Sequence, residues 1–120
     1  MDNDLTEEII KIAASPHLIA SASKAHEILA ELNSLISDLR LEVNELELVS
    51  DLHHNQLMQQ EGKSIPLKES EYKISEPYKE WKKKSGTLTD LRAVRRNLDR
   101  HAELLSSQER FGRKTPSYVG

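Results

Sequence analysis

Residues 18–57 read LIASASKAHEILAELNSLISDLRLEVNELELVSDLHHNQL, and small or apolar side chains recur there every three or four positions. The spacing alternates four, three, four, three without a break along one line of residues: Leu18, Ala22, Ala25, Leu29, Leu32, Ile36, Leu39, Val43, Leu46, Ser50, His53 and Leu57. We call this line the seam. Its period predicts one helix, from about 16 to 60, with every seam residue on one face. A helix of about 40 residues is roughly 60 Å long and cannot bury its own face, so it needs other helices beside it.

The composition of the seam indicates a bundle of helices rather than a two-stranded coil. Ile28, Leu35 and Val49 each precede a seam residue and widen the apolar face. Ser50 and His53 are polar positions within the seam, which lower stability but fix the register of packing. We interpret His53 as a core histidine and not as a metal ligand. The expected fold class is therefore all-α.

A second periodic stretch near the C-terminus predicts the helix that packs against the first. Its apolar positions are again three and four apart: Leu91, Val94, Leu98, His101 and Leu105. We expect this helix over about 88–110, after a break at Gly86, with Thr87 as N-cap and Gly112 as C-cap. It would fold back antiparallel on the long helix. At roughly 34 Å it would cover only about half of the seam.

The uncovered half of the seam predicts self-association. A homodimer or tetramer is the commonest way to bury such a face, and a different protein that supplies the missing helix is the rival. The residues expected in this contact are Leu18, Ala22, Ala25, Ile28, Leu29, Leu32, Leu35 and Ile36.

Shorter segments complete the predicted domain over residues 1–112. Asp4 and Glu7 form a capping box for a helix from about 5 to 14, and Ser15-Pro16 ends it and opens the next. Residues 63–77 alternate apolar and polar positions twice, which predicts either a small β-hairpin or an extended loop. Residues 113–120 are polar and basic, and we expect them to form a flexible tail.

Composition excludes several classes of protein. There is no cysteine, so neither a disulfide framework nor a thiolate site is expected. The acidic N-terminus has no apolar signal-peptide core, and no apolar run approaches the length of a membrane span, so we expect no membrane partner. A cytoplasmic location is predicted, or a nuclear one in a eukaryote, or the host cytoplasm if the chain is viral.

Motifs of enzymes are missing from the sequence. It has no glycine-rich phosphate loop, no Gly-x-Ser-x-Gly and no His-Glu-x-x-His. The five histidines include no pair four residues apart. We therefore predict a protein that is not an enzyme, with no catalytic residue, no cofactor and no metal site.

Charge divides the chain into an acidic and a basic half. Residues 1–62 hold twelve acids and three bases, whereas residues 63–120 hold eight acids and fourteen bases. At 100° per residue, Arg92, Arg96, Arg100 and Arg95 lie opposite the apolar stripe of the C-terminal helix. Arginine suits carboxylates and phosphates through its planar guanidinium. The residues expected to bind an anionic partner are Lys82, Lys83, Lys84, Arg92, Arg95, Arg96 and Arg100.

Two functions fit these features. The first is a helical interaction or assembly module that self-associates through the seam and presents its basic face to an acidic protein. The alternative is an accessory nucleic-acid-binding protein without sequence preference, because Trp81 beside the lysine run combines stacking with positive charge. Two simpler interpretations also fit, in which the arginine face is merely solvated and Trp81 is an anchor of the core.

Overall fold

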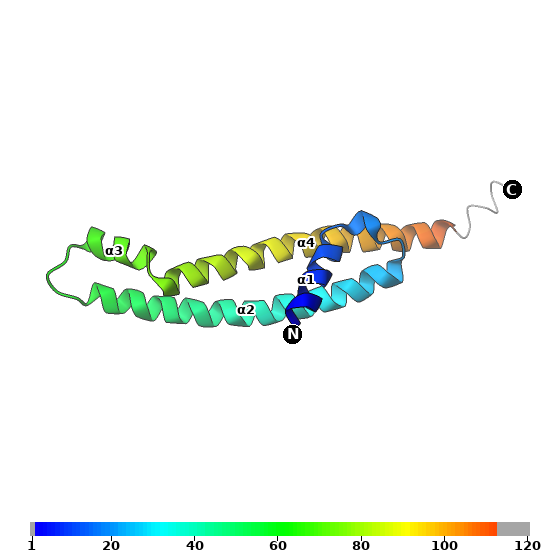
Figure 1. Ribbon diagram of the computed structural model, residues 1–120. Coiled ribbons are helices and arrows are strands. Elements are labelled where there is room, and N and C mark those ends of the chain that lie inside the picture. Colours follow the sequence, from blue (N-terminus) through cyan, green and yellow to red (C-terminus); the bar gives the residue numbers. More distant parts are fainter. Residues whose placement is uncertain (1, 113–120) are drawn as a thin grey trace. The chain divides into compact units, whose positions relative to one another are not determined.

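The computed structural model describes residues 2–112 and contains helices only (Figure 1). The elements are α1 (Asp2–Ala13), the 3₁₀ turn η1 (Pro16–Leu18), α2 (Ala22–Met58), α3 (Ile65–Lys73) and α4 (Glu76–Gly112). No strand occurs within the described range, and the all-α prediction is confirmed. The tail predicted for 113–120 lies outside the described residues.

The two long helices pack against each other as an antiparallel hairpin. Contacts near the start of α2 follow this direction: the amide of Ala22 donates to Glu109 Oε2 at 2.6 Å, whereas His26 Nε2, further along α2, lies 3.5 Å from Ser106 Oγ, further back on α4. The antiparallel C-terminal helix was therefore predicted correctly, but its extent was wrong. The helix starts at Glu76 and passes through Gly86. It is therefore 37 residues long, the same length as α2.

Gly86 does not break α4 because an isolated glycine only weakens a helix, by about 1 kcal/mol relative to alanine. The packing of a long apolar stripe outweighs that cost. The start of α4 is instead set by Ser75, whose carbonyl accepts from the Lys79 amide at 3.1 Å, and by Pro77 in the first turn.

The chain divides into two compact units. Unit 1 comprises the described parts of Met1–Ile36 and Asp90–Gly120, and unit 2 comprises Ser37–Thr89. Each unit contains one part of α2 and one part of α4. The prediction of a single domain over residues 1–112 stays a prediction.

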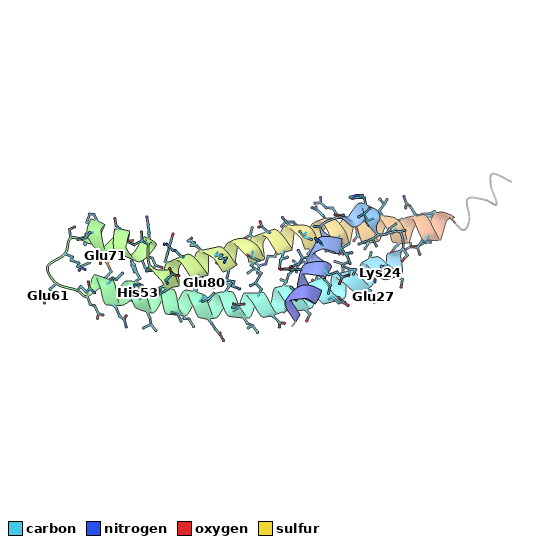
Figure 2. The ribbon with its side chains drawn as sticks, in the orientation of Figure 1. Lys24, Glu27, His53, Glu61, Glu71 and Glu80 are labelled. Carbon is cyan, nitrogen blue, oxygen red and sulfur yellow. The ribbon has the colours of Figure 1, made fainter. Side chains whose placement is uncertain are left out.

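Unit 1 has an aliphatic core. Its fully buried side chains include Ala25 and Leu32 of α2 and Leu98 and Ala102 of α4. The segment before α2 is fixed by His101, whose Nε2 donates to the carbonyl of Ile19 at 2.9 Å. On the exposed side of α2, Lys24 and Glu27 form an ion pair at 3.8 Å (Figure 2).

The N-terminal boundary of α2 differs from the prediction. The helix begins at Ala22 instead of near residue 16, because Ser21 Oγ accepts from the Lys24 amide at 3.1 Å and so caps the new start. Ser15-Pro16 opens only the short turn η1. The first helix, expected over about 5–14, is present as α1, but it starts at Asp2, so Asp4 lies inside the helix and the predicted capping box does not mark its start.

Unit 2 contains α3 where a hairpin or an extended loop was predicted, and both alternatives are wrong. Ser64 Oγ accepts from the Leu67 amide at 3.3 Å, and Pro66 lies in the first turn, so the segment carries an N-terminal helix signal. The buried residues of α3 are Lys68 and Tyr72, four apart. That helical spacing prevails over the alternation of apolar residues.

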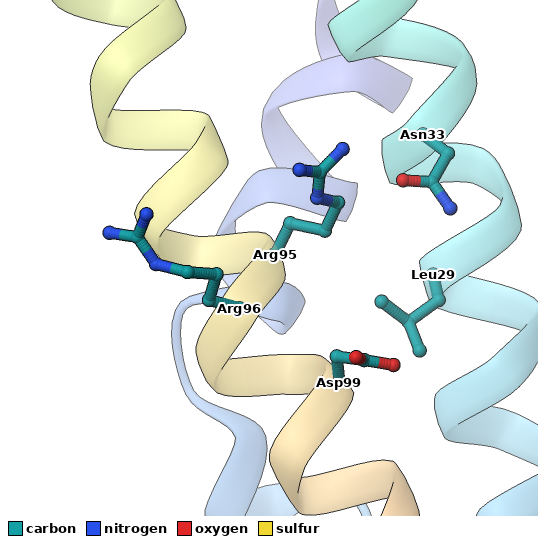
Figure 3. Close-up of a pocket in the computed structure, with 5 residues that line it drawn as sticks. All are labelled: Leu29, Asn33, Arg95, Arg96 and Asp99. Carbon is teal, nitrogen blue, oxygen red and sulfur yellow. The ribbon is translucent and has the colours of Figure 1, made fainter.

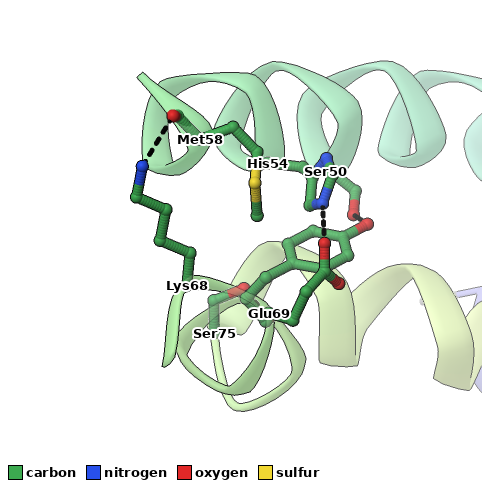
Figure 4. Close-up of polar contacts among 7 residues, drawn as sticks. Ser50, His54, Met58, Lys68, Glu69 and Ser75 are labelled. Carbon is green, nitrogen blue, oxygen red and sulfur yellow. Dashed lines mark hydrogen bonds and ion pairs between the residues drawn. The ribbon is translucent and has the colours of Figure 1, made fainter. Parts of the chain in front are cut away.

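Polar contacts attach α3 to the end of α2 (Figure 4). Ser50 and Tyr72 share a buried hydrogen bond of 2.7 Å between their hydroxyl oxygens. His54 Nε2 lies 2.8 Å from Glu69 Oε1, and its ring packs edge-on against Tyr72. Lys68 Nζ donates to the carbonyl of Met58 at 2.8 Å, which satisfies the C-terminal end of α2. In unit 2, hydrogen-bonded polar side chains thus hold α3 against the end of α2.

Candidate functional site

The predicted arginine face lies on the part of α4 that belongs to unit 1. Leu91, Leu98 and Leu105 are buried on the opposite side of the helix, while Arg92, Arg96 and Arg100 are exposed. The structure therefore places the arginine and apolar stripes as the sequence predicted. Within residues 2–112, none of these three guanidiniums forms an ion pair. Three neighbouring positive charges, one helical turn apart, therefore have no acidic partner among the residues that the structure describes.

Arg95 lies at the edge of this face and lines an open pocket with Arg96 and Asp99 (Figure 3). The pocket has a volume of about 360 Å³, and Leu29 and Asn33 of α2 form its other wall. Asp99 is directed toward Leu29, whereas Arg96 is directed away from α2. Because the Arg96 side chain is directed away from α2, Arg95 and Asp99 supply the charges that face the pocket, with amide donors from Asn33. These groups suit a single carboxylate or phosphate group.

Acids interrupt the arginine face. Asp99 and Glu103 fall within about 20° of Arg92 around the helix axis, and both are exposed. The face is thus a mixed pattern dominated by arginine, and a partner must match both signs of charge.

The lysine run lies in unit 2, and its members differ from one another. Lys84 Nζ is 3.3 Å from Glu42 Oε1, so its charge is partly used within the hairpin. Lys82 Nζ lies 4.7 Å from the centre of the Trp81 ring and 5.7 Å from that of Tyr78. Lys83 is exposed. Because Lys82 already covers an aromatic face, Trp81 is a poorer platform for a stacked base than the sequence suggested.

The predicted oligomer seam is already filled within the chain. Leu18 is 74% exposed in η1, and Leu35 is half-buried. The other six residues are buried inside unit 1: Ala22, Ala25, Ile28, Leu29, Leu32 and Ile36. The premise that this part of the seam lacks a partner is wrong, because the part of α4 from Asp90 onward packs in the same unit and meets it, as the contact of Ala22 with Glu109 shows. Self-association itself stays a prediction.

A second apolar line on α2 was missed by the sequence reasoning. Leu41, Leu48 and Leu52 lie outside the seam and are 64%, 66% and 62% exposed. Val49, which was assigned to the widened seam, is also more than half exposed. The signal was present in the sequence, since these leucines are spaced seven and four apart and share one helical face.

Two further histidines lie outside these surfaces. His53 is half-buried, and His26 Nε2 lies 3.5 Å from Ser106 Oγ. In the described part of the chain, no three His, Cys, Asp or Glu residues are grouped to hold a metal ion. None of the helices described is long and apolar enough to cross a membrane.

The chain matches no protein-family model, no curated protein and no solved structure.

Proposed function

We propose that this protein is a non-enzymatic helical interaction module whose arginine face binds an acidic protein. One observation supports this most directly: Arg92, Arg96 and Arg100 are exposed together on the side of α4 opposite the core, and no ion pair among residues 2–112 involves them. Like charges four residues apart cost a helix some stability. A binding role gives a reason for keeping them.

The charge pattern favours a protein over a nucleic acid. A phosphate backbone carries negative charge at every step, and Asp99 and Glu103 would oppose it on this face. A protein partner can place acids against the arginines and a base against Asp99 or Glu103. The pocket beside Arg95 would then accept one acidic side chain. Nucleic-acid binding is the second candidate, favoured by the exposed Lys83 next to Trp81 and Lys82.

The test compares two variants with the same change in net charge. Arg92→Gln/Arg96→Gln/Arg100→Gln removes the arginine face, and Lys11→Gln/Lys24→Gln/Lys73→Gln removes three exposed charges elsewhere. The probes are a labelled glutamate-rich peptide and labelled single- and double-stranded oligonucleotides at about 50 mM salt, where ionic contacts are strongest. We expect the wild type to bind the peptide, the arginine variant to lose at least about tenfold in affinity, and the lysine variant to change little.

Two results would contradict this function. Equal losses in the two variants would mean that only net charge matters, and no binding by the wild type would remove the arginine face as a site. A shift of oligonucleotides that exceeds peptide binding and is lost in the arginine variant would establish the nucleic-acid alternative instead.

Assembly with a second copy and a cytoplasmic location stay part of the proposal. A homodimer or tetramer built on Leu32 and its neighbours would require unit 1 to open, because those side chains are buried. Recognition through the arginine face requires no such rearrangement.

A further inference from the structure

The outer leucines of α2 form a continuous apolar strip in unit 2. At 100° per residue, Leu41, Leu48 and Leu52 fall within a sector of about 40°, and the buried Ser50 lies on the opposite side of the helix. Each of the three is more than 60% exposed. Isolated surface leucines are ordinary. Three leucines on one line over about 16 Å, however, make an apolar surface long enough for another helix to pack on. We call these residues the leucine strip.

Acidic residues border the leucine strip on both sides. Asp38 and Glu45 follow one edge and Asp51 follows the other, and all three are exposed. None of them forms an ion pair within the part of the chain that the structure describes. Residues 38–52 contain five acids and a single base, Arg40. The leucine strip is therefore an apolar surface whose surroundings carry net negative charge.

This charge decides between the candidate occupants. A second copy that docked by symmetry would bring the edge that holds Asp38 and Glu45 against the same edge of its partner, and like charges across an interface are unfavourable. A helix with leucine-like residues every three or four positions and lysine or arginine beside them would satisfy both the apolar strip and the acidic borders.

We propose that the leucine strip binds one basic amphipathic helix of a partner protein. The helix packs along α2 for about three turns, with its apolar side chains between Leu41, Leu48 and Leu52 and its basic side chains beside the bordering acids. The surface is separate from the arginine face, which lies in unit 1, and the proposal does not depend on that face binding anything.

The probe is a designed, labelled peptide of about 18 residues with leucines in heptad positions and lysines elsewhere. A second peptide keeps the leucines and replaces every lysine with glutamate. The strip variant is Leu41→Gln/Leu48→Gln/Leu52→Gln, and its matched control is Leu18→Gln/Leu67→Gln/Leu104→Gln, which changes three exposed leucines elsewhere. Fluorescence anisotropy measures affinity, and circular dichroism checks that the variants stay helical.

We expect the strip variant to bind the basic peptide at least about tenfold more weakly than wild type, because apolar area at the contact is lost. The control variant and Arg92→Gln/Arg96→Gln/Arg100→Gln should bind within about twofold of wild type. The variant Asp38→Asn/Glu45→Gln/Asp51→Asn should bind more weakly and show a flatter dependence on salt. This last variant keeps the leucines, so it still tests the proposal if the strip variant loses helix.

Three outcomes overturn the inference. The first is equal loss of binding in the strip variant and its control. The second is equal affinity of the wild type for the basic and the acidic peptide. The third is a dimer of the wild type in light scattering that the strip variant fails to form, because a second copy would then occupy the surface.

Discussion

The two units of this hairpin are stabilised in different ways. The fully buried side chains described in unit 1 are those of alanine and leucine, on α1, α2 and α4. Unit 2 buries Ser50, Lys68 and Tyr72 together with Val43, Leu57 and Leu88. Apolar contacts are additive and tolerant of direction, whereas buried polar groups need a partner at the right distance and angle. One hairpin therefore combines a core sensitive to lost volume with a core sensitive to lost hydrogen bonds.

Loss of volume in unit 1 should give the largest effect. Leu32→Ala and Leu98→Ala each leave a cavity around a fully buried position, and we expect each to lower the free energy of unfolding by about 2–5 kcal/mol. Leu48→Ala, at an exposed position of the same helix as Leu32, should stay within about 0.5 kcal/mol of wild type. Urea denaturation followed by circular dichroism measures all three. Similar values for Leu32→Ala and Leu48→Ala would show that unit 1 lacks a packed core.

Loss of a hydrogen bond in unit 2 should give an intermediate effect. Ser50→Ala and Tyr72→Phe each remove one partner of the 2.7 Å contact, and each should cost about 1–2 kcal/mol because a buried hydroxyl is left unpaired. The double variant should cost less than the two single variants together, by roughly 1 kcal/mol. Tyr78→Phe, which keeps a half-buried ring nearby, serves as the control. Additive losses would mean that the two hydroxyls do not stabilise unit 2 through each other.

Substitutions at the two glycines of unit 2 change the backbone and not the core, so their effects on the free energy of unfolding should be the smallest. Gly62 has φ +83°, a conformation that alanine adopts only with strain, so Gly62→Ala should destabilise by about 1 kcal/mol. Gly86 lies inside α4, and an added Cβ would meet nothing within 4 Å. Gly86→Ala should therefore stabilise by about 0.5–1 kcal/mol. Thermal unfolding of both variants measures the signs, and the same sign at both positions would contradict this assignment of their backbone roles.

The errors in prediction have local causes. Ser64 followed by Pro66 is a helix-start signal similar to Ser15-Pro16, whereas the alternation of Ile65 with Leu67 and of Tyr72 with Ile74 predicts an extended segment. The sequence does not predict that Lys68 is buried, because a lysine is buried only when a partner such as the Met58 carbonyl is supplied by another segment. Gly86 predicts a break, but α4 continues through it because a single glycine costs the helix less than its packing contributes.

The arginine face was predicted from angles alone, because the position of a side chain around a helix depends only on its place in the sequence. Its pocket was not predicted, since Leu29 and Asn33 lie more than sixty residues away from Arg95 along the chain. A pocket lined by both helices forms only when α4 packs on α2 in one particular register.

The sequence by itself determined the helical class, the seam and the antiparallel partner, because the period of apolar residues is a local property that any packed helix must follow. Only the tertiary structure decided which side chains the partner covers. The length of α4 closes the seam within one chain, and it leaves Leu41, Leu48 and Leu52 on the outside. The physical reason is that burial is a long-range quantity: it depends on which segments meet, and spacing along one helix does not contain that information.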